Sequence, residues 1–353
     1  MFSLPILEDQ LAHYVNGSSA EAFTNPFDFV NVPVVTREQS LAEDRTKKLT
    51  TATPTLKAPS LGPKKSEAAS AAQASANATA ASLQYAQALQ QIPEFKAYGP
   101  VLKSSPVVEL TERETEYVVS AVKHLFKEHF VLQFDIKNTL SDYVLADLSV
   151  VCTPSANEDG ELPEGLDEDF IIPIDQLKAD EPGTVYVSFS RPSEPAFVAA
   201  SFTNVLKFTL KEIDPTTSEP EESGYDDEYQ VEDLELSGAD YVLPAFAGSF
   251  DNIWTGLADA DEAEETLQLG NVKGISDAVE HLVKALGMQP LEGSEVALST
   301  STHSLRLYGK SVTGGKVAGT VRMAYSAKSG VTVKISARSE EEGLAALVVG
   351  GVA

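Results

Sequence analysis

Six strand-like runs follow one another between residues 111 and 240. The runs are rich in β-branched and aromatic residues, and turn-forming residues such as Pro173 and Pro182-Gly183 separate them. They are TEYVVSAVKHLF, HFVLQFDIKN, VLADLSVVC, FIIPI, GTVYVSFSR and VLKFTLKEI. Several short strands at this spacing favour an antiparallel β-sandwich of the immunoglobulin-like kind.

After residue 240 the pattern changes to helices that alternate with strands. The run PAFAGSFDNIWTGL predicts an amphipathic helix, because four apolar side chains follow helical spacing: Phe246, Phe250, Ile253 and Leu257. A second helix is predicted for SDAVEHLVKALG, and strands are predicted at 303–310, 316–327 and 330–338. We therefore expect residues 93–240 to form the β-sandwich and residues 241–353 to form an α+β platform.

The first 92 residues have a different character. Residues 1–48 contain too few apolar side chains to close a core alone. Residues 49–92 are rich in Ala, Ser and Gln and predict a disordered, flexible linker, because they cannot offset the entropy of ordering. Two acidic stretches, at 157–169 and 219–235, are expected to be solvated loops.

Residues 301–339 contain seven basic side chains and no Asp or Glu, within a chain whose formal charge is −27. They are Arg306, Lys310, Lys316, Arg322, Lys328, Lys334 and Arg338. In GVTVKISAR the period of two places Lys334 and Arg338 on one face of the strand and the apolar residues on the other. This pattern fits either the solvated face of a half-buried sheet or a patch that binds an acidic partner.

The composition and motifs limit the possible functions. The 53 acids against 26 bases argue against nucleic acid as the main ligand. The sequence contains no run of 18 apolar residues, so no transmembrane helix is predicted. The single cysteine, Cys152, lies in a strand-like run, which favours a buried thiol. No catalytic, metal-binding or cofactor-binding motif is present, so we predict a protein that is not an enzyme and needs no cofactor or metal. A hydrolase that uses two carboxylates of the acidic stretches stays open as an alternative.

Trp254, the only tryptophan, is predicted at the edge of the helix stripe. A side chain in this position can be half covered by the sheet and half open, which suits an anchor for a peptide aromatic. It can equally be an ordinary core residue. Together with the basic strand faces, an exposed tryptophan favours short motifs that carry Phe or Trp among Asp and Glu.

Several longer runs resemble the C-terminal half of the gamma subunit of coatomer, the COPI vesicle coat. They are PEFKAYGPVLKSSP (93–106), LTERETEYVV (110–119), FTLKEIDPTT (208–217), GYDDEYQVEDLE (224–235), SFDNIW (249–254) and LGMQP (286–290). PFDFVNVP (26–33) resembles the end of that subunit's trunk, so residues 1–48 are expected to be a remnant of it. The helical-repeat trunk itself is absent from the sequence.

The resemblance implies a two-subdomain appendage (ear) that recruits accessory proteins, notably Arf GTPase-activating proteins. It implies other coatomer subunits as partners, peripheral membrane association through the coat, and a cytoplasmic location on Golgi membranes and COPI vesicles in retrograde and intra-Golgi transport. By the same resemblance, Trp254 and Phe250 are the centre of the partner site, and basic platform residues assist. Strand position makes Arg322, Arg338, Lys334 and Arg306 the candidates for that role. The alternative within the same architecture is the ear of a clathrin adaptor.

Overall fold

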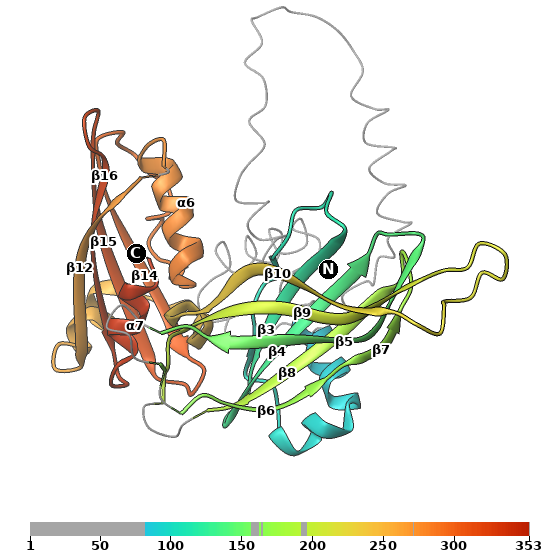
Figure 1. Ribbon diagram of the computed structural model, residues 1–353. Helices are drawn as coiled ribbons and strands as arrows, with labels where there is room; N and C mark the ends of the chain where they lie inside the picture. The colour runs from blue at the N-terminus through green and yellow to red at the C-terminus, as the bar shows by residue number, and fades with distance from the viewer. Residues whose placement is uncertain (1–81, 157–161, 164, 192–195, 271, 353) are drawn as a thin grey trace, which may run out of the picture. The chain divides into compact units, whose positions relative to one another are not determined.

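The computed structural model describes residues 82–156, 162–163, 165–191, 196–270 and 272–352 (Figure 1). These residues form two sheets of a β-sandwich and one sheet of a platform, all with antiparallel pairing between the named strands. The predicted architecture, an antiparallel β-sandwich followed by an α+β platform, is confirmed. The expected trunk remnant at 1–48 and most of the expected linker at 49–92 lie outside the described residues.

The first sandwich sheet consists, in spatial order, of β1 (Lys103–Ser104), β3 (Tyr117–Leu125), β4 (His129–Asn138), β8 (Pro182–Ser190) and β6 (Asp167–Ile172), with β2 (Val108–Glu109) also paired to β3. The second consists of β10 (Tyr225–Leu236), β9 (Ala200–Glu212), β5 (Tyr143–Pro154) and β7 (Ile174–Leu177). Alternate residues of both sheets meet in one apolar core. Phe130 and Phe189 of the first sheet contact Phe202 of the second, with ring centroids 5.8 Å and 5.1 Å apart.

The acidic stretch at 219–235 is mostly a strand, and the expectation of a solvated loop there is wrong. Strand β10 pairs with β9 along its length. Its carboxylates are exposed, while Val231, Leu234 and Leu236 are buried in the core. Burial of these three side chains anchors the charged run at the edge of the sheet, where its carboxylates stay in solvent. Of the other acidic stretch, residues 157–161 and 164 lie outside the described residues, and β6 begins at Asp167.

The outer face of the first sandwich sheet is covered by the chain that enters it. Residues 82–91 are helical, and the 3₁₀ helix η2 (Pro93–Tyr98) follows. Leu89 and Phe95 are buried against Phe126 and Val131 of the sandwich in a second apolar cluster. Residues 82–91 fall within the range expected to be linker, and the buried Leu89 explains why they are ordered.

A buried histidine lies beneath this helix. The Nε2 of His124 is 3.1 Å from Gln133 Oε1, and the Gln133 amide nitrogen donates to the carboxylate of Asp135. The Gln133 oxygen is therefore an acceptor, so the His124 Nε2–H donates and Nδ1 accepts from the Ser104 hydroxyl at 2.9 Å. Both ring nitrogens are satisfied in the neutral form, and burial lowers the pKa of His124 to about 4.

We expect the stability of the protein to fall on acidification because of His124. Its pKa is about 4 in the folded chain and 6.5 without burial, so the unfolded chain binds the proton first. The stabilisation of the folded state that arises from the lowered pKa of His124 is fully present above pH 6.5, and it is lost as the pH falls from 6.5 towards 4. Urea unfolding at several pH values checks this, with His124→Gln expected to flatten the dependence and exposed His281→Gln to leave it unchanged. Identical profiles for the wild-type protein and His124→Gln would contradict the assignment.

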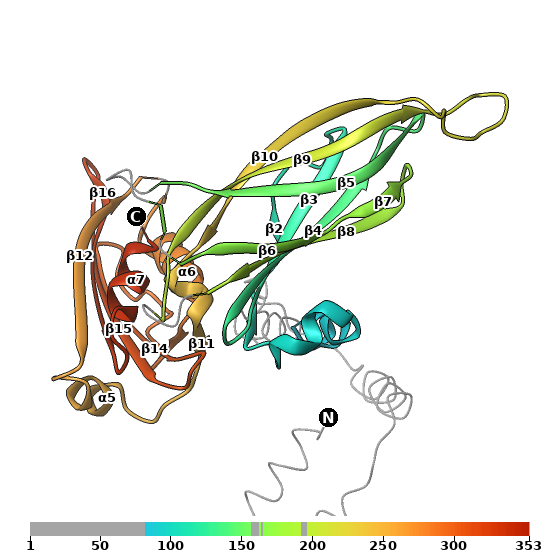
Figure 2. The ribbon, with the colours of Figure 1, turned by 60° about the horizontal axis from the view of Figure 1, so that its bottom comes forward.

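The platform sheet consists, in spatial order, of β11 (Val242–Pro244), β14 (Thr302–Ser311), β15 (Lys316–Ser326), β16 (Gly330–Ser339) and β12 (Asp261–Leu269), with β13 (Gln289–Pro290) also paired to β14. Helices α6 (Ile275–Leu286) and α7 (Leu344–Gly350) lie on one side of this sheet, as Figure 2 shows. Their apolar side chains pack with Leu307, Val317 and Ile335, which defines the inner face. The predicted second helix and three long strands are confirmed.

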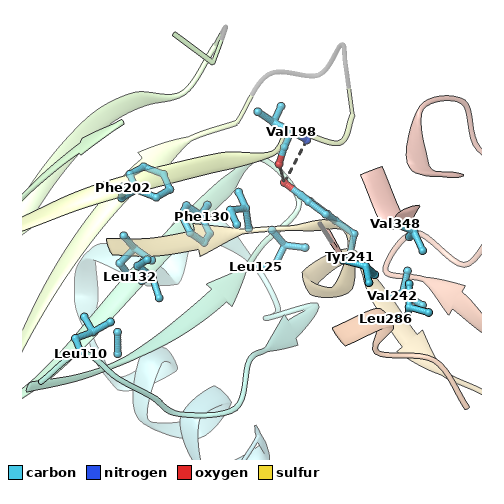
Figure 3. Close-up of a cluster of buried hydrophobic side chains, with 14 of the residues drawn as sticks. Leu110, Leu125, Phe130, Leu132, Val198, Phe202, Tyr241, Val242, Leu286 and Val348 are labelled. Carbon is cyan, nitrogen blue, oxygen red and sulfur yellow. Dashed lines mark hydrogen bonds between the residues drawn. The ribbon is translucent and has the colours of Figure 1, made fainter. Parts of the chain in front are cut away.

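The sandwich and the platform share a continuous apolar core at residues 237–242 (Figure 3). The fully buried Tyr241 donates its hydroxyl to the carbonyl of Val198 at 2.9 Å. It precedes Val242, which packs with Leu286 and Val348 of the platform in the same cluster. The backbone here also needs glycine, because a Cβ on Gly238 would lie 2.5 Å from the Leu347 carbonyl of α7.

Two lysines of the sandwich bind the start of the platform. Lys103 Nζ donates to the carbonyls of Ala239 and Val242 at 2.5 Å each. Lys123 Nζ lies 2.6 Å from the carboxylate of Asp240, and both side chains are only 12% exposed. Burial lowers the pKa of Lys103 to about 8, and the charge of Asp240 acts against that shift.

Candidate peptide-binding site on the platform

A short helix, α5 (Phe250–Gly256), positions the tryptophan on the outer face of the platform sheet. The carboxylate of Glu292 accepts the backbone N–H of Phe250 at 3.1 Å and so satisfies a donor at the helix start. Phe250 and Leu257 pack on Tyr308 and Ala318. These two strand residues have the opposite parity to the inner-face residues Leu307 and Val317, so α5 lies on the other side of the sheet.

The predicted first helix is shorter than its sequence pattern indicates. Phe246 lies before α5 and is 83% exposed, so its assignment to the core stripe is wrong. The intervening Ala247-Gly248-Ser249 includes two poor helix formers, and the helix begins only where Glu292 can bind its N–H. Phe250 and Leu257 are buried and Ile253 is half-buried, as expected of core residues.

Trp254 is half-buried between an aromatic ring and a guanidinium group. Its ring stacks on Phe250, with centroids 5.6 Å apart and an interplanar angle of 21°. The guanidinium of Arg338 lies 4.2 Å from the Trp254 ring centroid, a cation–π contact. Arg338 also donates to the Trp254 carbonyl at 2.9 Å and to the Glu262 carboxylate at 3.2 Å and 3.3 Å. Arg338 therefore holds the indole in place, and Phe250 supports it from the core.

The other predicted site residues lie on the same face of the sheet. Arg306 is on β14, Arg322 on β15, and Lys334 on β16 directly opposite Arg322. The guanidinium of Arg306 lies 5.6 Å from the centroid of the Phe250 ring and pairs with Glu292. The structure thus brings Trp254, Phe250, Arg306, Arg322, Lys334 and Arg338 together on one face, around α5 and the three central strands.

Most of the basic segment is neutralised by acids from outside it. Four of its seven side chains make ion pairs: Arg306 with Glu292 and Asp251, Lys316 with Glu340, Lys334 with Glu264, and Arg338 with Glu262. Among the described residues, Arg322 has no ion pair. The pKa values of Glu264 and Glu292 are lowered, chiefly by hydrogen bonds from Lys334 and from the Phe250 N–H respectively.

The strand that provides two of these acids was not predicted. Strand β12, DEAEETLQL, follows α5 and pairs with β16 in a register that sets Glu262 opposite Arg338. Its first half is acidic and has few apolar residues, so the sequence shows little of a strand pattern. The only available signal was the alternation in TLQL at its end, where Leu267 packs on the core and Leu269 is buried in it.

Those carboxylates of the two acidic stretches that belong to described residues lie on the surface. A hollow of about 470 Å³ beside β10 is lined by Asp147, Asp226, Asp227 and Glu228 among others, and all four are exposed. A general acid needs burial to raise its pKa towards neutrality. Within the described residues no group of three or more His, Cys, Asp or Glu side chains could hold a metal ion. No helix in the described part of the chain is long and apolar enough to cross a membrane.

Comparison with known proteins agrees with this architecture. The family model "Coatomer gamma subunit appendage platform subdomain" matches residues 83–237, which here form the helix at 82–91 and the sandwich. The model "Coatomer subunit gamma-1 C-terminal appendage platform" matches residues 239–352. The boundary between the two lies beside Gly238, at the junction of the sandwich with the platform.

Relatives match over almost the whole chain. The probable coatomer subunit gamma of Schizosaccharomyces pombe is 40% identical, over 99% of this chain and 37% of its own length. Coatomer subunit gamma of Dictyostelium discoideum is 39% identical over 75% of this chain and 29% of its own length. Coatomer subunit gamma-1 of Mus musculus is 37% identical over 96% of this chain and 36% of its own length. The chain thus spans between 29% and 37% of the length of these relatives.

A β-sandwich joined to an α+β platform that presents one tryptophan among basic strands defines an appendage (ear) module of the vesicle-coat type. The chain belongs to the coatomer gamma family, and residues 83–352 form the appendage of that family. The family expected from the sequence is confirmed, and the clathrin-adaptor alternative is set aside.

Proposed function

We propose that the platform of this chain binds accessory proteins of the COPI coat through short segments in which an aromatic residue lies among acidic ones. Arf GTPase-activating proteins are the expected partners. As part of a coatomer gamma subunit, the chain would act with other coatomer subunits in the cytoplasm, on Golgi membranes and COPI vesicles, without spanning the membrane. No catalytic step is required of it.

The observation that supports this proposal is the way Trp254 is held. A half-exposed indole between Phe250 and Arg338 is a rigid apolar platform that loses little entropy on binding. The cation Arg322 lies on the same face and can contact an acid of the partner. Rigid aromatic residues beside arginine are the usual centres of binding energy in protein interfaces.

Replacing Trp254 with serine tests the proposal. We expect binding of the full chain to an Arf GTPase-activating protein to weaken at least about 30-fold, because a central aromatic typically contributes 2 kcal/mol or more. Isothermal titration calorimetry measures the affinity, and circular dichroism confirms the fold. Tyr325→Ser is the matched control, since Tyr325 is 40% exposed on the same subdomain and is outside the cluster around Trp254.

The wild-type chain offers a second readout. Trp254 is its only tryptophan, so its fluorescence should change when the partner covers the indole. Equal affinity of Trp254→Ser and the wild-type protein would exclude Trp254 as the centre of the site.

A further inference from the structure

Glu264 occupies the basic face in the way that a bound carboxylate would. It projects from edge strand β12, opposite Ser336 in the register with β16. One carboxylate oxygen lies 2.5 Å from Lys334 Nζ, and the other accepts from the Ser336 hydroxyl at 3.0 Å. Both oxygens of Glu264 are therefore bound by side chains that belong to the basic segment.

The surroundings of Lys334 require an anion. Lys334 lies directly opposite Arg322 on β15, so two cations face each other across neighbouring strands. Like charges in this position are destabilising, and a counter-charge close to one of them reduces the repulsion. Glu264 supplies that charge, and the lowered pKa of its carboxyl arises mainly from Lys334 and Ser336, with a contribution from Arg322.

The contact can exchange with solvent and with ligands. The side chains of Lys334 and Glu264 are 46% and 50% exposed, and an exposed ion pair contributes little to stability. The neighbouring pair differs, because the Arg338 side chain is only 17% exposed and is bound to Trp254 by stacking and by a hydrogen bond. Glu262 therefore helps to position the indole, whereas Glu264 binds Lys334 and Ser336 and does not contact the indole cluster.

We propose that Glu264 is a built-in competitor for the acidic residues of the partner, which must displace it to reach Lys334, Ser336 and Arg322. This inference rests on the proposed function. It assigns to β12 a role in selectivity: a peptide with one weak acid would not displace Glu264, whereas a peptide with several acids would. Glu264 would thereby reduce binding of aromatic segments that carry only one acidic residue for this site.

The geometry also sets the separation between the aromatic residue and the acidic residue of the bound peptide. Lys334 precedes Arg338 by four residues on β16, which corresponds to about 13 Å at 3.3 Å per residue. An extended peptide that covers Trp254 beside Arg338 would therefore place an acid at Lys334 about four residues from its aromatic residue.

The test compares two glutamates that are adjacent on β12. Glu264→Gln removes the competing charge and keeps the side-chain size, and Glu265→Gln removes the same charge one position further on, on the other face. Glu265 is exposed and makes no ion pair within the described part of the chain. The probe is a fluorescein-labelled 12-residue peptide with one central Phe and Asp residues three to five positions on either side. A second peptide carries Asn in place of every Asp.

Fluorescence anisotropy with the full chain should show that Glu264→Gln binds the Asp peptide about three- to tenfold more tightly than the wild-type protein. Glu265→Gln should match the wild-type protein, and the Asn peptide should not distinguish the variants. No gain for Glu264→Gln, equal gains for both variants, or no binding of the Asp peptide to Glu264→Gln overturns the inference. The proposed function is tested apart from it by Trp254→Ser and the Arf GTPase-activating protein, whose result does not depend on Glu264.

Discussion

Replacing Tyr241 with alanine is expected to lower the free energy of unfolding by about 3–5 kcal/mol, the usual range for removing a large buried aromatic side chain. The ring is fully buried at the junction of sandwich and platform and lies 5.3 Å from the Phe197 ring, measured between centroids. Its removal leaves a cavity in a core that both subdomains share, and it leaves the carbonyl of Val198 without its donor. Urea unfolding followed by circular dichroism measures the change.

Two further variants separate the causes. Tyr241→Phe keeps the ring and removes the hydroxyl, so it should cost only about 1–2 kcal/mol. Tyr225→Ala, at a tyrosine that is 54% exposed, should cost less than about 0.5 kcal/mol. In Tyr241→Ala the unfolding transition followed by Trp254 fluorescence, which reports on the platform, should separate from the transition followed by circular dichroism. A loss in Tyr241→Ala no larger than that in Tyr241→Phe would show that the junction does not depend on the ring.

Asp240→Asn should also be strongly destabilising, by about 3–5 kcal/mol, because it removes one partner of a buried ion pair. Asp240 accepts from Lys123 at 2.6 Å and from the backbone N–H of Ser237 at 2.9 Å. It is also the carboxylate whose charge favours the protonated form of the buried Lys103. Without it, two lysines that bind the start of the platform lose their counter-charge. Urea unfolding at neutral pH provides the measurement.

The matched control is Asp233→Asn, at an exposed aspartate of β10 that makes no ion pair among the described residues. It changes the net charge equally and should alter stability by less than about 0.5 kcal/mol. The double variant Lys123→Met with Asp240→Asn should lose less than the sum of the two single variants, since the residues interact directly. If the losses of unfolding free energy in the two single variants added up to the loss in the double variant, the interaction between Lys123 and Asp240 would contribute nothing to stability.

The sequence pattern predicted the sandwich well because its strands carry the information locally. In β4, the inward residues Phe130, Leu132, Phe134 and Ile136 alternate along the run, and the same alternation identifies β9. The pattern did not predict β10, because only a few apolar residues lie among its many acidic ones. It also did not predict the start of α5, because that start depends on the hydrogen bond from the Phe250 N–H to the distant Glu292. Burial of Leu89 against the sandwich was likewise not visible in an Ala-rich run.

The candidate site was predictable in part. Helical geometry placed Trp254 at the edge of its stripe, and the structure finds it half-buried. Strand parity put Lys334 and Arg338 on one face, which the register confirms. The charge balance of that face could not be predicted, because Glu262 and Glu264 lie some 70 residues earlier in the chain. Only the pairing of β12 with β16 brings them beside the bases.

The negative charge of the chain is concentrated where the sheets end. Strand β10 carries six acidic residues and β12 carries four, and each is the terminal strand of its sheet. The outer edge of such a strand has free backbone hydrogen-bonding groups that could pair with another copy of the chain. Two copies that approached edge to edge would bring these carboxylates together. The acids of β10 and β12 should therefore disfavour edge-to-edge pairing between copies of the chain, and aggregation, at high concentration.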